Sequence, residues 1–81
     1  MHINILVTGG AGYIGSHVCK ALAFEGYTPI TYDNLSNGNR FAVKWGPFIE
    51  GDIRDGRLLE KTLKSYEPLG IIHLAALTNA R

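Results

Sequence analysis

The chain has little of what several protein classes require. Its single cysteine, Cys19, excludes a disulfide framework or a cysteine-rich metal cluster within one chain. No segment approaches the run of about 20 apolar residues that a membrane helix needs, and residues 1–7 lack the pattern of a signal peptide. A formal net charge of +1 provides no basic field, so neither nucleic acid nor an anionic membrane is an expected partner. We therefore expect a cytoplasmic protein.

The sequence also lacks obvious catalytic groups. None of its four tyrosines begins a Tyr-x-x-x-Lys motif, and no nucleophile is placed beside a base. The three histidines share no metal-ligand spacing, so no metal site is predicted. The chain is expected to bind a ligand and to contribute no catalytic residue.

With 81 residues there is room for one small domain, residues 1–81, and none for a second, substrate-binding domain. A hydrophobic content of 46% with 19% charged residues is typical of a globular chain.

The most informative segment is a glycine-rich turn at residues 7–15, Val-Thr-Gly-Gly-Ala-Gly-Tyr-Ile-Gly. Gly10, Gly12 and Gly15 fit G-x-G-x-x-G, while Gly9 with the latter two fits G-x-x-G-x-x-G. Glycines allow positive φ and let the backbone approach a pyrophosphate, and a following helix presents its N–H groups to the anion. This context predicts a dinucleotide-binding loop, the alternative being a turn that only joins strand to helix.

Hydrophobic periodicity predicts strands alternating with helical segments. Strands are expected at residues 2–8, 27–32, 47–50 and 71–74, with Pro29 marking a bend or an edge-tolerant position. A helix from 12 to about 25 should bury a stripe of Ile14, Val18, Ala21 and Leu22, and a second helix, capped by Asp55, should bury Leu58, Leu59, Leu63 and Tyr66. The predicted fold is α/β: the first half of a Rossmann-like doubly wound parallel sheet, about four strands in the order 3-2-1-4.

In such a sheet the loops at 8–12, 33–39 and 51–55 meet at the carboxyl ends of the strands. Asp33 ends the second strand, where a carboxylate accepts the adenosine ribose hydroxyls and repels a 2′-phosphate, favouring NAD over NADP. An ordinary turn aspartate is the alternative.

Arg40 is interpreted as a solvated surface arginine and not as a 2′-phosphate ligand. Asp52 is either an acceptor for the adenine amino group or a helix-start aspartate, and spacing leaves both open.

Four stretches together resemble the extended short-chain dehydrogenase/reductase family. They are Thr-Gly-Gly-Ala-Gly-Tyr-Ile-Gly-Ser-His at 8–17, Tyr-Asp-Asn-Leu-Ser-Asn-Gly at 32–38, Glu-Gly-Asp-Ile-Arg-Asp at 50–55 and Ile-His-Leu-Ala-Ala at 72–76. The first two are more similar to the family's nucleotide-sugar epimerases than to its sugar dehydratases. The resemblance covers nearly the whole chain but only about the amino-terminal quarter of a usual member. It implies bound NAD, with a UDP-sugar substrate in the full-length enzyme only.

The resemblance also implies a role for individual positions. The phosphate loop would comprise Gly9, Gly12 and Gly15, with the backbone N–H groups of Tyr13 and Ile14. The adenosine ribose would be held by Asp33, Asn34, Asn37 and Gly38. Adenine would meet Asp52 and the backbone of Ile53, and the path to the nicotinamide ribose would be lined by Leu74, Ala75 and Ala76. Thr78 stands where these enzymes commonly have a lysine, and their Tyr-x-x-x-Lys belongs to a later part of the family chain.

Three interpretations follow from these observations. In the first, the chain is the cofactor-binding part of a nucleotide-sugar epimerase and is inactive alone. In the second, it is the same part of another such enzyme, either a dehydratase or a uronate epimerase. In the third, it is a nucleotide-binding module without catalysis. In each, an unpaired fourth strand would favour self-association through residues 71–77.

Overall fold

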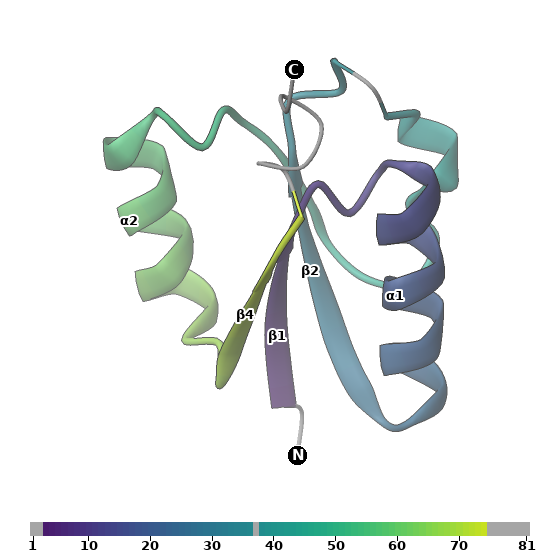
Figure 1. Ribbon diagram of the computed structural model, residues 1–81. Coiled ribbons are helices and arrows are strands. Elements are labelled where there is room, and N and C mark those ends of the chain that lie inside the picture. The colour runs from purple at the N-terminus through teal and green to yellow at the C-terminus, as the bar shows by residue number, and fades with distance from the viewer. Residues whose placement is uncertain (1–2, 37, 75–81) are drawn as a thin grey trace.

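The computed structural model describes residues 3–36 and 38–74, which form a four-stranded parallel sheet with helices on both faces (Figure 1). In chain order the elements are β1 (Ile3–Thr8), α1 (Tyr13–Phe24), β2 (Tyr27–Asp33), the 3-10 helix η1 (Arg40–Ala42), β3 (Phe48–Glu50), α2 (Gly56–Tyr66) and β4 (Gly70–His73). The strand order is β3-β2-β1-β4. The predicted Rossmann-like half-fold is confirmed.

The register aligns the carboxyl ends of the strands. Thr8 at the end of β1 lies opposite Tyr32 of β2 and His73 of β4, and Asp33 at the end of β2 lies opposite Glu50 of β3. The loops that leave these strands therefore meet at one edge of the sheet, the upper edge in Figure 1.

Pro29 occupies the edge-tolerant position that its residue type demands. It pairs with Ile5 of β1, whereas the pairing of β2 with β3 begins only at Thr31. The Thr31 N–H donates to the carbonyl of Pro47, 2.9 Å away, on the β3 side. Because amides two residues apart in a strand point the same way, the missing N–H of Pro29 falls on the side where β3 has not yet begun.

The core consists of two layers, one on each face of the sheet, because side chains of a strand alternate between faces. On the α1 face, Ile5, Val7 and Cys19 are buried together. On the α2 face, Leu6, Ile30 and Tyr32 form the buried centre. The predicted α2 stripe is confirmed, since its four members pack against this second layer: Leu58, Leu59, Leu63 and Tyr66.

The ends of α2 also follow the sequence. Asp55 is the N-cap, and its carboxylate accepts from the Leu58 N–H at 3.1 Å. At the other end Glu67 adopts a left-handed conformation, φ 45°, and its N–H donates to the Leu63 carbonyl. The helix thus ends at a left-handed residue directly before Pro68.

The predicted buried stripe of α1 is only half right. Leu22 packs against the α1-side core and Val18 is half-buried, but Ile14 is 62% exposed and Ala21 is exposed. The fully buried residues of the helix are Gly15 and Cys19. A Cβ at position 15 would overlap the carbonyl oxygen of Gly9 and lie 2.7 Å from the Gly10 Cα. The helix therefore presents its glycine to the loop, and this close approach sets its rotation about its own axis.

Strand β4 is an edge strand of the described sheet. It pairs there with β1 alone, and Ile71 is 56% exposed. Of the helices in the described part of the chain, none has the length and apolar content to cross a membrane.

We predict that Gly15→Ala destabilises the chain by about 2 kcal/mol, because the added methyl group meets backbone atoms that cannot move independently. The sign of the change in the free energy of unfolding is informative, because replacing glycine with alanine inside a helix otherwise stabilises a protein by about 1 kcal/mol. Urea unfolding measures the difference. Gly12→Ala is the matched control and should cost about 1 kcal/mol or less, and equal losses for the two variants would contradict the packing argument.

Candidate dinucleotide-binding site

The glycine-rich loop is held in place by backbone hydrogen bonds. Gly9 has a positive φ of 78°, and its N–H donates to the Tyr32 carbonyl at 2.8 Å. The Gly12 N–H donates back to the Gly9 carbonyl at 3.2 Å, and Gly12 is the N-cap of α1. Among the described residues no side chain caps this helix, so the backbone amides of its first turn face the site edge.

The loop glycines divide into those that the fold needs and one that it does not. A Cβ at Gly10 would lie 2.8 Å from the Thr31 side chain, and one at Gly15 would overlap the loop backbone. At Gly12 the nearest atom to an added Cβ is the Gly9 carbonyl oxygen at 3.5 Å, an ordinary contact. With φ of −78°, Gly12 is also unstrained for any residue. Nothing in the fold of the described residues requires glycine at position 12.

Asp33 joins the glycine-rich loop to the loop after β2. Its side chain accepts from the Ala11 N–H at 2.9 Å on Oδ2 and from the Leu35 N–H at 2.8 Å on Oδ1. The residue is 8% exposed. A carboxylate has about four acceptor positions, so after these two contacts within the described part of the chain one on each oxygen is left for a further donor such as a ribose hydroxyl. Asp33 is both a turn aspartate and a candidate ligand.

The loop after β2 packs closely on the glycine-rich loop. The Asn39 N–H donates to the Ala11 carbonyl at 3.0 Å, and a Cβ at Gly38 would lie 2.9 Å from Ala11. Arg40 instead lies over the Phe48 ring, with its guanidinium carbon 4.8 Å from the ring centroid, and is exposed as expected.

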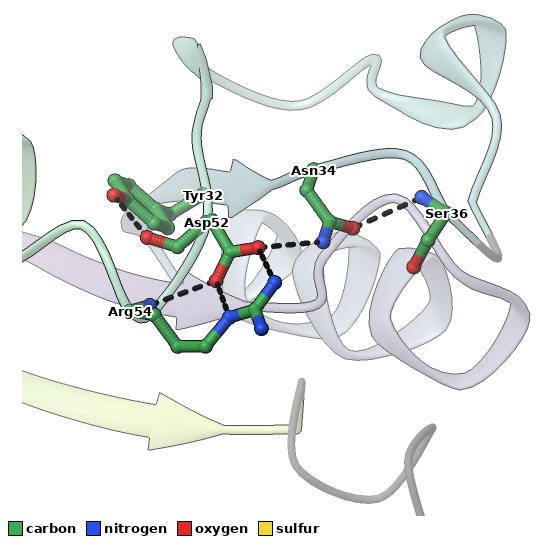
Figure 2. A network of polar contacts seen from close by, with 5 residues as sticks. All are labelled: Tyr32, Asn34, Ser36, Asp52 and Arg54. Atoms are coloured by element: carbon green, nitrogen blue, oxygen red, sulfur yellow. Dashed lines mark hydrogen bonds and ion pairs between the residues drawn. The ribbon is translucent and has the colours of Figure 1, made fainter.

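Asp52 lies at the centre of a polar network that Figure 2 shows. Arg54 donates to Asp52 Oδ1 from its backbone N–H at 2.8 Å and from Nε at 3.0 Å, and to Oδ2 from Nη2 at 2.8 Å. Asn34 Nδ2 donates to Oδ2 at 3.4 Å, and Asn34 Oδ1 accepts from the Ser36 N–H at 2.9 Å. These hydrogen bonds, those of the Arg54 side chain first, hold the pKa of the Asp52 carboxyl well below its usual range.

The backbone of Asp52 is fixed from the sheet. The hydroxyl of the buried Tyr32 donates to the Asp52 carbonyl at 2.9 Å. Burial, followed by the charges of Asp55 and Asp52, raises the pKa of that hydroxyl, which keeps it a donor. The helix-start role considered for Asp52 belongs to Asp55. The Asp52 carboxylate instead accepts the Arg54 N–H within the turn, and its contact with adenine stays a prediction. Ile53 packs into the α2-side core.

At the end of β4, Leu74 donates its N–H to the Thr8 carbonyl at 2.9 Å and packs against the α1-side core. Thr8 Oγ1 and His73 Nδ1 are hydrogen-bonded at 2.6 Å. The remaining predicted positions, Asn37, Ala75 and Ala76, and the departure at Thr78, lie outside the described residues. Among the described residues no group of three or more potential ligands could hold a metal ion.

Sequence reasoning overlooked Arg54, the Tyr32 hydroxyl and the Thr8–His73 pair. A signal for Arg54 was present, because a basic residue two positions after Asp52 in a short turn can fold back onto the carboxylate. The other two depend on strand register, which the sequence does not give.

The parallel sheet with a glycine-rich turn before α1 and a carboxylate at the end of β2 defines a Rossmann-like dinucleotide-binding unit. The sequence matches the NAD dependent epimerase/dehydratase family over residues 5–81. The chain therefore belongs to that family, which confirms the resemblance inferred from its motifs.

Among known proteins, the chain is 57% identical to a UDP-glucose 4-epimerase of Rhizobium meliloti over 91% of this chain and 23% of that protein. The crystal structure of UDP-glucose 4-epimerase from Brucella ovis in complex with NAD matches with a TM-score of 0.88 and 54% identity, over 89% of this chain and 22% of that one. A dTDP-glucose 4,6-dehydratase from Bacillus anthracis, in complex with NAD, is 36% identical with a TM-score of 0.81, over 90% of this chain and 26% of that one. The chain spans about a quarter of the length of these relatives.

We predict that Arg54→Ala raises the pKa of Asp52 toward its ordinary value of about 3.9. Because the folded-state pKa is depressed, any stability that this exposed pair contributes is present above about pH 4 and is lost as pH falls toward the folded value, and we expect that contribution to be small. The carboxyl carbon shift of Asp52, followed against pH by NMR, measures the pKa directly. Arg57→Ala is the control, and an ordinary Asp52 titration in the unmodified chain would contradict the pairing.

Proposed function

We propose that the chain binds NAD along the carboxyl edge of its sheet, as the cofactor-binding part of a UDP-glucose 4-epimerase. Three loops converge there, and the most similar relatives include an epimerase solved in complex with NAD. The observation that carries the proposal is Gly12: the described fold has room for a side chain at this position, so a close-lying ligand is the reason for a glycine.

The proposed placement follows the three loops. The pyrophosphate lies at the first turn of α1, against the N–H groups of Tyr13 and Ile14, where the backbone amides and the helix dipole favour an anion. Asp33 takes the adenosine ribose, with Asn34 and Gly38 beside it. Adenine lies at Asp52 and the Ile53 backbone, and Leu74 lies toward the nicotinamide. The family resemblance adds Asn37 for the ribose and Ala75 and Ala76 for the nicotinamide side, three positions outside the described residues.

In the proposed reaction, UDP-glucose and UDP-galactose interconvert through a 4-keto sugar. NAD, when bound, would accept a hydride from C4 of the sugar and later return it. The residues of this chain bind and orient the cofactor. None of its tyrosines begins a Tyr-x-x-x-Lys motif, so we expect no epimerase turnover from the 81 residues alone. The identities of 57% and 54% to the two epimerases described above, against 36% to the dehydratase, support this assignment.

We predict that Gly12→Val weakens NAD binding about 10- to 100-fold, because the side chain enters the space of the pyrophosphate and removes one amide–phosphate hydrogen bond, worth about 1.5–3 kcal/mol. Isothermal titration measures the affinity, and circular dichroism checks that the fold is kept. The NAD affinity of Gly12→Ala should lie between those of the unmodified chain and Gly12→Val. Unchanged affinity in Gly12→Val with a normal fold would show that the loop serves only as a turn.

We predict that the chain prefers NAD to NADP by about 5- to 150-fold, or about 1–3 kcal/mol, because a carboxylate repels the 2′-phosphate. Asp33→Ser should reduce the ratio of the NAD and NADP affinities below about threefold. Loss of the hydrogen bond to the Ala11 N–H should also lower the affinity for both cofactors. Asp55→Ser removes the same charge and keeps a good N-cap, so its ratio should match that of the unmodified chain. A ratio near one in the unmodified chain would refute the role of Asp33.

The 81-residue polypeptide is also expected to self-associate through β4, whose outer edge is unpaired in the described sheet. Light scattering should show dimers or larger species that Ile72→Lys weakens. A monodisperse monomer at high concentration would overturn this expectation. A cytoplasmic location without nucleic-acid or membrane partners stays a prediction from composition.

A further inference from the structure

The four acceptor positions of the Asp52 carboxylate are occupied unequally. Three are taken by Arg54 at 2.8–3.0 Å, from the backbone N–H, Nε and Nη2. The fourth, on Oδ2, is taken by Asn34 Nδ2 at 3.4 Å, beyond the usual range for an N–H···O bond. One position is therefore held weakly, and by a neutral donor.

This fourth position lies between two loops of the proposed cofactor site. Figure 2 shows the Asp52 carboxylate with Arg54 on one side and Asn34, from the loop after β2, on the other. The Asn34 donor is an amide NH2, which is the same kind of group as the exocyclic amino group of adenine. A ligand amino group can replace it without leaving the carboxylate unpaired, since Asn34 is exposed and can turn to water.

The contacts between the Arg54 side chain and the Asp52 carboxylate contribute little to the stability of the fold. The Arg54 side chain is 88% exposed and that of Asp52 31% exposed, and exposed ion pairs contribute little to stability. The rigid guanidinium fork fixes both carboxylate oxygens in direction, which an ammonium group cannot do.

We propose that Arg54 is a positioning residue that sets the base specificity of this site: by occupying three acceptor positions of Asp52, it leaves one for a single amino N–H. A purine with a 6-amino group fits this position, whereas a 6-oxo group turns its own lone pairs toward the carboxylate. The inference rests on the proposed function. The low pKa of Asp52 agrees with it, because an ionised carboxylate has no proton to donate to a 6-oxo group.

The test compares NAD with nicotinamide hypoxanthine dinucleotide, in which the adenine amino group is replaced by an oxo group and N1 carries a proton. Isothermal titration of the unmodified chain should give about 10- to 100-fold tighter binding of NAD, the value of one hydrogen bond to a charged acceptor. In Arg54→Ala the freed carboxylate can rotate and accept the N1 proton of hypoxanthine, so the ratio should fall below about threefold.

Two further variants separate geometry from charge. Arg54→Lys keeps the charge and loses the fork, so its ratio should fall as in Arg54→Ala. Arg57→Ala removes an exposed arginine that has no ion pair among the described residues, and its ratio should equal that of the unmodified chain. Circular dichroism and urea midpoints should be alike for all four proteins.

The role of Arg54 is overturned if Arg54→Ala or Arg54→Lys prefers NAD over the hypoxanthine dinucleotide as strongly as the unmodified chain does. That result would leave NAD binding itself intact. Failure of the unmodified chain to bind NAD overturns the proposed function, and this inference with it.

Discussion

The close approach of α1 to the glycine-rich loop is the constraint on which the site depends. Gly15 lies against the Gly9 carbonyl with no room for a side chain. This contact places the uncapped first turn of α1 beside the carboxyl ends of β1 and β2, and it turns the Gly15–Cys19 side of the helix toward the sheet. Anion-binding geometry and core packing therefore have one cause.

Two aspartates extend this arrangement across the sheet edge. Asp33 accepts the Ala11 N–H and so fastens the glycine-rich loop to the end of β2. Asp52 connects the end of β3 to the loop after β2 through Asn34, and its carbonyl is held by the buried Tyr32. Each carboxylate has a structural partner and an acceptor position that is open or weakly held, which is why side chains that stabilise the loops can also bind a ligand.

Most of the fold could be predicted from the sequence, because the strands are apolar runs and the helices have recognisable ends. Asp55 as the cap of α2, and Pro29 at a position of β2 that precedes its pairing with β3, both follow from local chemistry. The buried face of α1 could be predicted only in part from apolar residues: Val18 and Leu22 lie on it, but its centre is Gly15, which contributes no hydrophobicity. Likewise, the contacts of Asp52 depend on how two loops meet, and local propensities do not specify that meeting.

Binding of NAD along this edge can be measured by an amide NMR titration of the unmodified chain. We expect saturable shifts concentrated in residues 9–15, with smaller ones around Asp33 and in residues 51–54. Shifts confined to other parts of the chain, or no saturable shift at millimolar NAD, would contradict it.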